Sequence, residues 1–145
     1  MRILLQRVKN GSVSIDGKIH SKIDKGLLLL VGITHTDTEE IADFLINKFV
    51  NLRIFEDENG KMNLSCKDIG GEILLVSQFT LYGDTSRGRR PGFERSAKPD
   101  FANNLFNYIV NETSKIAPTK SGVFGADMKV SLINDGPVTF MLEKD

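Results

Sequence analysis

The chain has 145 residues, of which 40% are hydrophobic and 26% charged, and its 19 basic and 19 acidic side chains give no formal net charge. These values are typical of a soluble domain. A chain of this length buries about 68 to 70% of its unfolded surface, so we expect one domain over residues 1–145. The longest apolar run, residues 26–33, is far shorter than the roughly 20 residues that cross a bilayer. No signal-peptide pattern opens the chain, and we expect a cytoplasmic protein without membrane contact.

Metal and cofactor chemistry is poorly supported by the residue inventory. Cys66, His20 and His35 are the only cysteine and histidines, and they show no zinc-ligand spacing. Glycine motifs for dinucleotides or phosphates are also absent. We therefore expect neither a metal ion nor a cofactor. The balanced charge argues against a protein that binds nucleic acid over its whole surface, but it allows a local basic patch.

The first quarter of the chain is predicted to form strands. Residues 2–8 and 12–23 are rich in β-branched residues, and Asp16-Gly17 is a pair that suits a tight hairpin turn. The run GLLLLVGI at 26–33 is too short for an ordinary helix and too uniformly apolar for a half-exposed strand. It predicts a central strand covered on both faces.

A helix is predicted next. Residues 36–39 offer capping oxygens followed by a carboxylate, and apolar residues then recur at helical spacing as far as Leu52. After this helix, residues 53–55 predict a short strand and residues 56–60 a polar turn.

The rest of the chain repeats the order of strand, helix and strands. Residues 71–81 predict a second apolar strand, and Pro99 suits the first turn of an amphipathic helix. Residues 129–134 and 138–143 predict two closing strands. Strands outnumber helices and neighbouring pairs look antiparallel. We therefore expect an α+β domain of β/β/α layers, with layered, largely antiparallel sheet and both helices packed on one side.

Polar side chains gather at the carboxyl end of the second apolar strand, in the segment Ser77-Gln78-Phe79-Thr80. Strand ends of this kind often deliver side chains and N–H groups to a cleft. On the residues alone, we favour the simpler interpretation of a strand that emerges into solvent. A nucleophilic Ser77 or Thr80 would need a base, and no local pattern pairs either hydroxyl with a histidine.

The dipeptide Gly136-Pro137 interrupts the two predicted closing strands. Its proline cannot donate to a strand ladder, and the bond before it could be cis. Because only about 5 to 6% of such bonds are cis, a plain turn is the favoured interpretation.

A basic segment precedes the second helix. It has one acidic residue, Glu94, and five basic residues: Arg87, Arg89, Arg90, Arg95 and Lys98. A basic loop could contact nucleic-acid phosphates, although arginines on surface loops are more often simply solvated.

Several segments together resemble one family. In chain order they are ILLQRV (3–8), GKMNLS (60–65), SQFTL (77–81), RPGF (90–93), GADMKVSL (125–132) and NDGPVTF (134–140). The sequence resembles the D-aminoacyl-tRNA deacylases along its whole length. The SQxT and NxGPxT signatures are far more specific as a pair than either is alone.

The resemblance implies the following activity and assembly. Such enzymes hydrolyse the ester that joins a D-amino acid, or achiral glycine as on mischarged tRNA(Ala), to the 3′-terminal adenosine of tRNA. The family implies a homodimer in which a cis Gly136-Pro137 enters the pocket of the other subunit. There its carbonyls would occupy the space that an L side chain needs. Asn134 and Thr139 would flank this chirality filter, and Arg7 would hold it from the partner subunit.

A fixed main-chain barrier has a physical reason. Differences in apolar contact are worth only about 1 to 3 kcal/mol, so strict rejection of a mirror-image substrate calls for a repulsive element.

The catalytic roles that the resemblance implies involve no protein base. The adenosine 2′-hydroxyl would help to activate water, while the Phe79 N–H and the groups of Ser77, Gln78 and Thr80 position the ester and its developing oxyanion. Phe124 and Met128 would line the pocket, with ordinary core packing as an equally good interpretation.

Two other functions remain open at this point. One is a serine or threonine hydrolase of small esters that acts through Thr80 and forms an acyl-enzyme. The other is a non-catalytic tRNA-binding module that uses the basic loop and ignores the chirality of the amino acid.

Overall fold

Strand β3 (Gly26–Gly32) lies in the middle of the computed structural model, which describes residues 1–145. In the main sheet it lies between β1 (Arg2–Ile15) and β6 (Glu72–Ser77). The side chains of Leu27, Leu28 and Leu29 are fully buried. The prediction of a central strand covered on both faces is therefore confirmed.

The other strands of the main sheet are β2 (Lys18–Ile23), β7 (Thr119–Ser121) and β8 (Lys129–Glu143), and the order is β2-β1-β3-β6-β7 with β8 on β1. The turn between β1 and β2 lies at Asp16-Gly17, as predicted. β1 runs antiparallel to β2, β3 and β8. β6 instead runs parallel to β3 and β7, because helical crossovers connect these strands. The sheet is thus largely antiparallel, as expected, and the two pairs that β6 forms are its parallel part.

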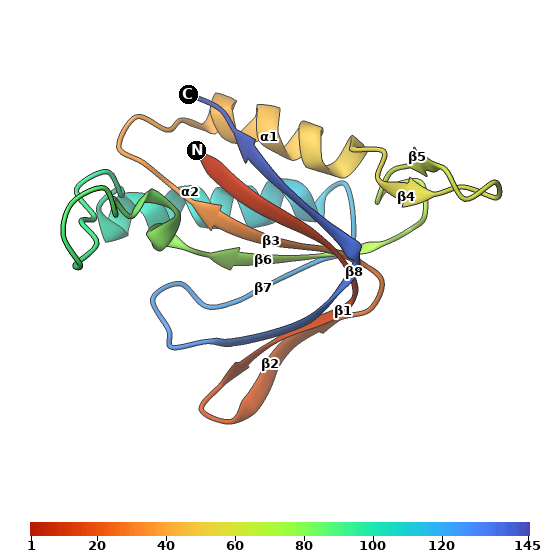
Figure 1. The fold of residues 1–145 in the computed structure, drawn as a ribbon, viewed down its shortest axis with the longest axis horizontal. Coiled ribbons are helices and arrows are strands. Elements are labelled where there is room, and N and C mark those ends of the chain that lie inside the picture. The colour runs from red at the N-terminus through yellow and green to blue at the C-terminus, as the bar shows by residue number, and fades with distance from the viewer.

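Both helices pack on the same side of the sheet (Figure 1). They are α1 (Glu39–Asn51) and α2 (Pro99–Ser114), and α1 is capped by Thr38, whose hydroxyl accepts from the Ile41 N–H at 3.3 Å. Their buried faces join β1, β3 and β6 in one core. A smaller core fills the other face of β3 and β6, against β1, β2 and partly buried residues of β8. This gives the expected β/β/α layering.

The short strands lie elsewhere than predicted. β4 (Phe55–Glu56) and β5 (Met62–Leu64) form a separate two-stranded sheet around the turn at 57–60. The strand predicted at 53–55 starts at its last residue, and Arg53 lies before it and donates from Nε to the Asn63 carbonyl of β5 at 2.8 Å.

Two predicted strand boundaries are corrected near the candidate site residues. β6 ends at Ser77, and the chain turns into a 3₁₀ helix, η1 (Phe79–Tyr82). β8 is one continuous strand rather than two. It pairs Thr139 with Gln6 and Asn134 with Val8, so the single residue between them on β1 faces residues 135–138, which bulge from the ladder.

None of the helices combines the length with the apolar composition that a bilayer span requires.

Candidate active site

A cleft of about 710 Å³ opens where β6 ends, and most of its lining side chains are hydrophobic. Its walls come from the β6–η1 junction, the segment that leads into α2, and the connection between β7 and β8. Five of the predicted site residues line it: Ser77, Gln78, Phe79, Phe124 and Met128. The structure thus joins segments that lie about 50 residues apart in the sequence.

Backbone pairing places the polar end of β6 at the cleft. Ser77 pairs with Val31 of β3, and the Gln78 N–H donates to the Val31 carbonyl at 2.8 Å. After this last contact with the sheet, the chain turns into η1. The Phe79 N–H therefore stands in the first turn of a helix, where N–H groups have no acceptor within the helix itself. Such an N–H is available to a ligand oxygen.

Phe79 also forms the mouth of the cleft. Phe79 is 53% exposed, and its ring meets the ring of Phe93 edge to face, with centroids 5.0 Å apart. Its carbonyl accepts a hydrogen bond from the Ser96 hydroxyl at 3.0 Å. This bond fixes the Phe79 backbone against the segment that leads into α2.

Thr80 lies beside the cleft, is exposed, and is not part of the lining. Its hydroxyl accepts a hydrogen bond from the Gln78 side-chain amide. Neither histidine lines the cleft: His20 lies on β2, and the His35 ring contacts the Glu94 carbonyl at 2.8 Å. Thr80 therefore has no histidine to activate it.

The positions of Phe124 and Met128 agree with both interpretations that the sequence left open, pocket lining and core packing. Phe124 lines the cleft and also packs against the larger core, with its ring 6.5 Å from that of Phe106. Met128 lines the cleft and packs against the smaller core.

Among the lining residues that sequence reasoning did not assign to the site are Phe93, Ser96, Lys98 and Asp127. Lys98 is the residue before α2. Asp127, the only carboxylate of the lining, forms an ion pair with Lys129 at 2.8 Å. The RPGF and GADM motifs adjoin these residues, but only the folded chain brings the two segments together.

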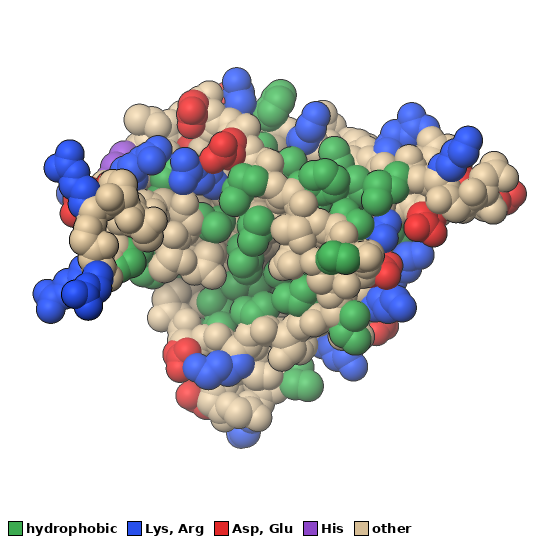
Figure 2. Space-filling model, in the orientation of Figure 1, with side chains coloured by type: hydrophobic (Ala, Val, Ile, Leu, Met, Phe, Trp, Pro, Cys, Tyr) green, Lys and Arg blue, Asp and Glu red, His purple; other side chains and the backbone are tan.

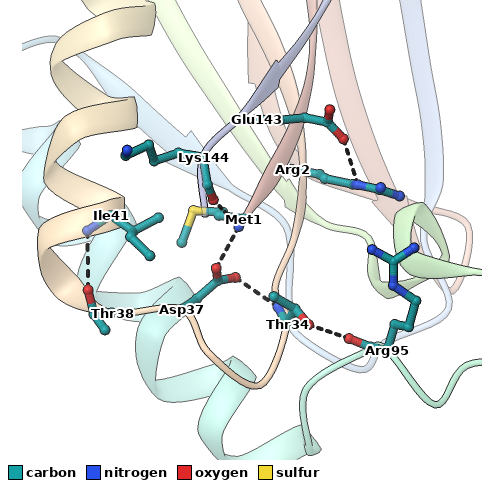
Figure 3. A network of polar contacts seen from close by, with 9 residues as sticks. All are labelled: Met1, Arg2, Thr34, Asp37, Thr38, Ile41, Arg95, Glu143 and Lys144. Carbon is teal, nitrogen blue, oxygen red and sulfur yellow. Dashed lines mark hydrogen bonds and ion pairs between the residues drawn. The ribbon is translucent and has the colours of Figure 1, made fainter.

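A polar network anchors the segment that carries Ser96 (Figure 3). The Asp37 carboxylate accepts from the Met1 amino group and, at 2.8 Å, from the Thr34 N–H. The Thr34 hydroxyl in turn donates to the Arg95 carbonyl, and Thr34 forms a β-bridge with Ser96. The rim of the cleft is therefore tied to the loop between β3 and α1.

The Gly136-Pro137 loop is the second group of predicted residues, and its peptide bond is cis. Arg7, whose side chain is almost fully buried, donates from Nε to the Asp135 carbonyl at 3.1 Å and from Nη1 to the Ile54 carbonyl at 2.6 Å. The Asp135 carboxylate lies 3.7 Å from Arg7 Nε. Arg7 therefore fixes the base of the loop.

Asn134 and Thr139 flank this loop and close it. The Asn134 side chain donates to the Thr139 hydroxyl at 2.9 Å and accepts from the Val138 N–H at 3.1 Å. Gly136 and Pro137 themselves are exposed. The tip of the bulge is thus exposed, while hydrogen bonds from Arg7 and Asn134 hold its base.

The two groups do not meet within one chain, because no residue of the Gly136-Pro137 loop lines the cleft. Within one chain Arg7 holds the base of this loop, and its action from a partner subunit stays a prediction. The contact within the chain follows from the place of Arg7 on β1, opposite the bulge of β8.

The cleft is chemically suited to binding an oxyanion and lacks an evident general base. Tyr82, the last residue of η1, is unsuited to proton transfer near neutral pH, because burial raises its pKa to about 12. The structure gathers no cluster of three or more His, Cys, Asp or Glu side chains that could hold a metal ion.

Comparison with known proteins supplies the family. The model of the D-Tyr-tRNA(Tyr) deacylase family matches residues 4–143. A solved structure described as a c-Myc DNA Unwinding Element Binding Protein is 38% identical, with a TM-score of 0.95 over 100% of this chain and 99% of that chain. A probable eukaryotic D-amino acid tRNA deacylase shares the fold, with a TM-score of 0.80, 18% identity and 97% of both chains covered. The chain belongs to the D-Tyr-tRNA(Tyr) deacylase family and is a hydrolase of the aminoacyl-tRNA ester bond.

Proposed function

We propose that the protein removes D-amino acids, and glycine mischarged on tRNA(Ala), from the 3′-terminal adenosine of tRNA as a homodimer. In this dimer the Gly136-Pro137 loop of each subunit enters the cleft of the other and excludes L-amino acids. One observation carries the proposal. The tip of the Gly136-Pro137 loop is exposed and its base is held by hydrogen bonds, yet the loop does not line the cleft of its own chain.

The surface beside the loop supports a subunit interface. β8, the strand that carries the loop, exposes the large apolar side chains Ile133, Phe140 and Met141. Hydrophobic side chains also gather across the middle of the face that Figure 2 shows, where β1 and β8 lie in Figure 1. Contiguous exposed apolar surface is typical of protein interfaces, and a second copy of the chain would cover it.

The construction of the loop suits a chirality filter. A backbone wall cannot rotate aside as a side chain can, and Arg7 and Asn134 hold this wall at both ends of the bulge. Placed against the Cα substituents of a bound aminoacyl group, it would leave room for hydrogen on one side only. Glycine carries hydrogen on both sides, so the same filter would accept it.

The chemistry we propose uses protein hydrogen-bond donors and the hydroxyl of the substrate. The Phe79 N–H would donate to the oxyanion that forms when water attacks the ester, and one well-aimed donor is worth about 10² to 10³ in rate. The adenosine 2′-hydroxyl would help to activate that water. Ser77, Gln78 and Thr80 would position the ester, in agreement with the absence of a histidine from the cleft.

A threonine hydrolase is less well supported, because the Thr80 hydroxyl lies outside the lining and bonds to the Gln78 amide rather than to a base.

The decisive experiment compares amino-acid release from one tRNA charged with the D-, the L- or the achiral residue. We expect rapid release of the D-amino acid and of glycine, and release of the L-amino acid at the uncatalysed rate. Equal release of both enantiomers would refute the filter. Sedimentation of the same protein should give two subunits, and a monomer that retains stereospecific activity would refute entry of the loop from a partner.

A further inference from the structure

The basic loop, residues 83–96, forms a short ribbon rather than an irregular coil. Asp84 and Gly92 form an isolated antiparallel bridge, with N–H···O distances of 2.8 and 2.9 Å in the two directions. The Asp84 carboxylate accepts from the Ser86 N–H at 2.9 Å, and hydrogen bonding to Ser86 lowers the pKa of this carboxyl below its ordinary value. The ribbon thus has a bonded base that persists at neutral pH.

The tip of the ribbon carries unpaired positive charge. Arg87, Arg89 and Arg90 are exposed, and none of them forms a hydrogen bond or ion pair within the chain. Arg2 and Arg7, in contrast, pair with Glu143 and Asp135. Figure 2 shows basic side chains projecting at the left edge, where Figure 1 places this loop. The chain has no net charge, so this concentration of arginine is a local feature.

The same ribbon forms part of the cleft. Its residues Phe93 and Ser96 belong to the lining, and Ser96 bonds to the Phe79 carbonyl. Arg90 is three residues before Phe93, which limits the chain between them to about 11 Å. A nucleotide strand whose end lies in the cleft would leave it beside the arginine tip.

We propose that Arg87, Arg89 and Arg90 bind the phosphates of the nucleotides that precede the terminal adenosine of tRNA. The inference rests on the proposed function, because the cleft must hold that adenosine. Guanidinium groups bind phosphate oxygens in a bidentate manner, and such contacts position a strand without reading its sequence. The ribbon therefore recognises the RNA part of the substrate, while the cleft and the filter recognise the aminoacyl group.

The test is the triple variant Arg87→Gln/Arg89→Gln/Arg90→Gln, assayed on D-aminoacyl-tRNA and on D-aminoacyl-adenosine, which has no phosphate. We expect the ratio of the KM for tRNA to the KM for the adenosine ester to rise about tenfold at low salt. We also expect a plot of the logarithm of the tRNA binding constant against the logarithm of the salt concentration to become less steep. Its slope should fall by about 0.7 for each phosphate that the variant no longer neutralises. Hydrolysis of the adenosine ester shows that the variant is folded.

The matched control is Lys18→Gln/Lys48→Gln/Lys67→Gln, which removes the same charge from exposed side chains on β2, on α1 and after β5. The control should leave the ratio unchanged. An unchanged ratio in the arginine variant, or an equal change in the control, would overturn the proposal.

Binding of uncharged tRNA at low salt tests the ribbon independently of catalysis. If the parent protein hydrolyses neither ester, the proposed function fails, and loss of tRNA binding in the arginine variant still supports the ribbon. The proposal would be overturned if the parent protein did not bind tRNA. It would also be overturned if the arginine variant lost binding to duplex DNA but still bound tRNA like the parent.

Discussion

The cleft at the end of β6 is concave, mainly hydrophobic and built from three separate segments, whereas the Gly136-Pro137 loop is a convex, exposed bulge of one strand. The cleft offers a first-turn N–H at Phe79 and the hydroxyl and amide groups of Ser77 and Gln78. The loop offers only main chain, fixed from below by the buried guanidinium of Arg7.

This difference separates two tasks that enzymes often combine. The cleft can bind an ester and stabilise its oxyanion, but it is open and gives no evident reason to prefer one enantiomer. The loop has the rigidity that discrimination requires, because its hydrogen bonds would have to break before it could yield. Rate should therefore depend on the cleft and on the substrate, and selectivity on the loop.

The largest effect should come from removing the 2′-hydroxyl of the terminal adenosine. If this group helps to activate the water, a 2′-deoxy D-aminoacyl-tRNA should bind normally but react about 10² to 10⁴ times more slowly. Single-turnover hydrolysis measures the rate, and a binding titration measures the affinity. A rate within a few-fold of normal would mean that a protein side chain activates the water.

Gly136→Ala should damage selectivity most among the protein variants. Gly136 has a φ of +130°, and an added Cβ would lie 2.8 Å from Val138 Cγ2 and 3.1 Å from Arg7 Nη2. We expect the ratio of D to L hydrolysis to fall at least about tenfold, within the range that 1 to 3 kcal/mol of lost discrimination allows. The control is Gly17→Ala, at a φ of +75° with no atom within 4 Å of the added Cβ. An unchanged ratio for Gly136→Ala would show that the loop is only a turn.

Arg7→Lys should have a smaller effect on selectivity and a measurable effect on stability. Lysine keeps the charge but cannot reach the Asp135 and Ile54 carbonyls together, so one charge-assisted hydrogen bond is removed. We expect urea unfolding to show a loss of about 1.5 to 3 kcal/mol, and the ratio of D to L hydrolysis to fall less than for Gly136→Ala. If Arg7→Lys unfolded at the same urea concentration as the parent, the hydrogen bonds to the Asp135 and Ile54 carbonyls would not both be needed for stability.

Thr80→Ala and Ser77→Ala should each keep a hydrolysis rate within about tenfold of the parent. The reason is that each hydroxyl is proposed to position the ester and not to attack it. The measurement is kcat on D-aminoacyl-tRNA. Complete loss of turnover in folded, dimeric Thr80→Ala, with an acyl-threonine trapped in the parent, would favour the covalent hydrolase.

Asp127→Asn should have the smallest effect. Asp127 is the only carboxylate in the lining, but it is exposed and paired with Lys129. We expect kcat to stay within about threefold of the parent value across pH 6 to 8. A much larger loss of kcat would show that the Asp127 carboxylate takes part in the reaction.

Short-range sequence patterns predicted the central strand and the starts of both helices. The central strand follows from an apolar run with no polar interruption, the start of α1 from Thr38, and the start of α2 from Pro99. These features depend on short-range rules of periodicity, capping and backbone restriction. The resemblance carried by the SQFT and NDGPVT segments also identified the family that the comparisons show.

How these segments act together follows from long-range contacts in the folded chain. Asp127 and Ser96 line one cleft because parallel pairing of β3, β6 and β7 brings distant loops to one edge of the sheet. Arg7 bonds to the loop of its own chain because the register of β1 with β8 places Arg7 opposite the bulge. The partner and direction of each strand depend on contacts between residues far apart in the chain, which the pattern within one segment does not specify.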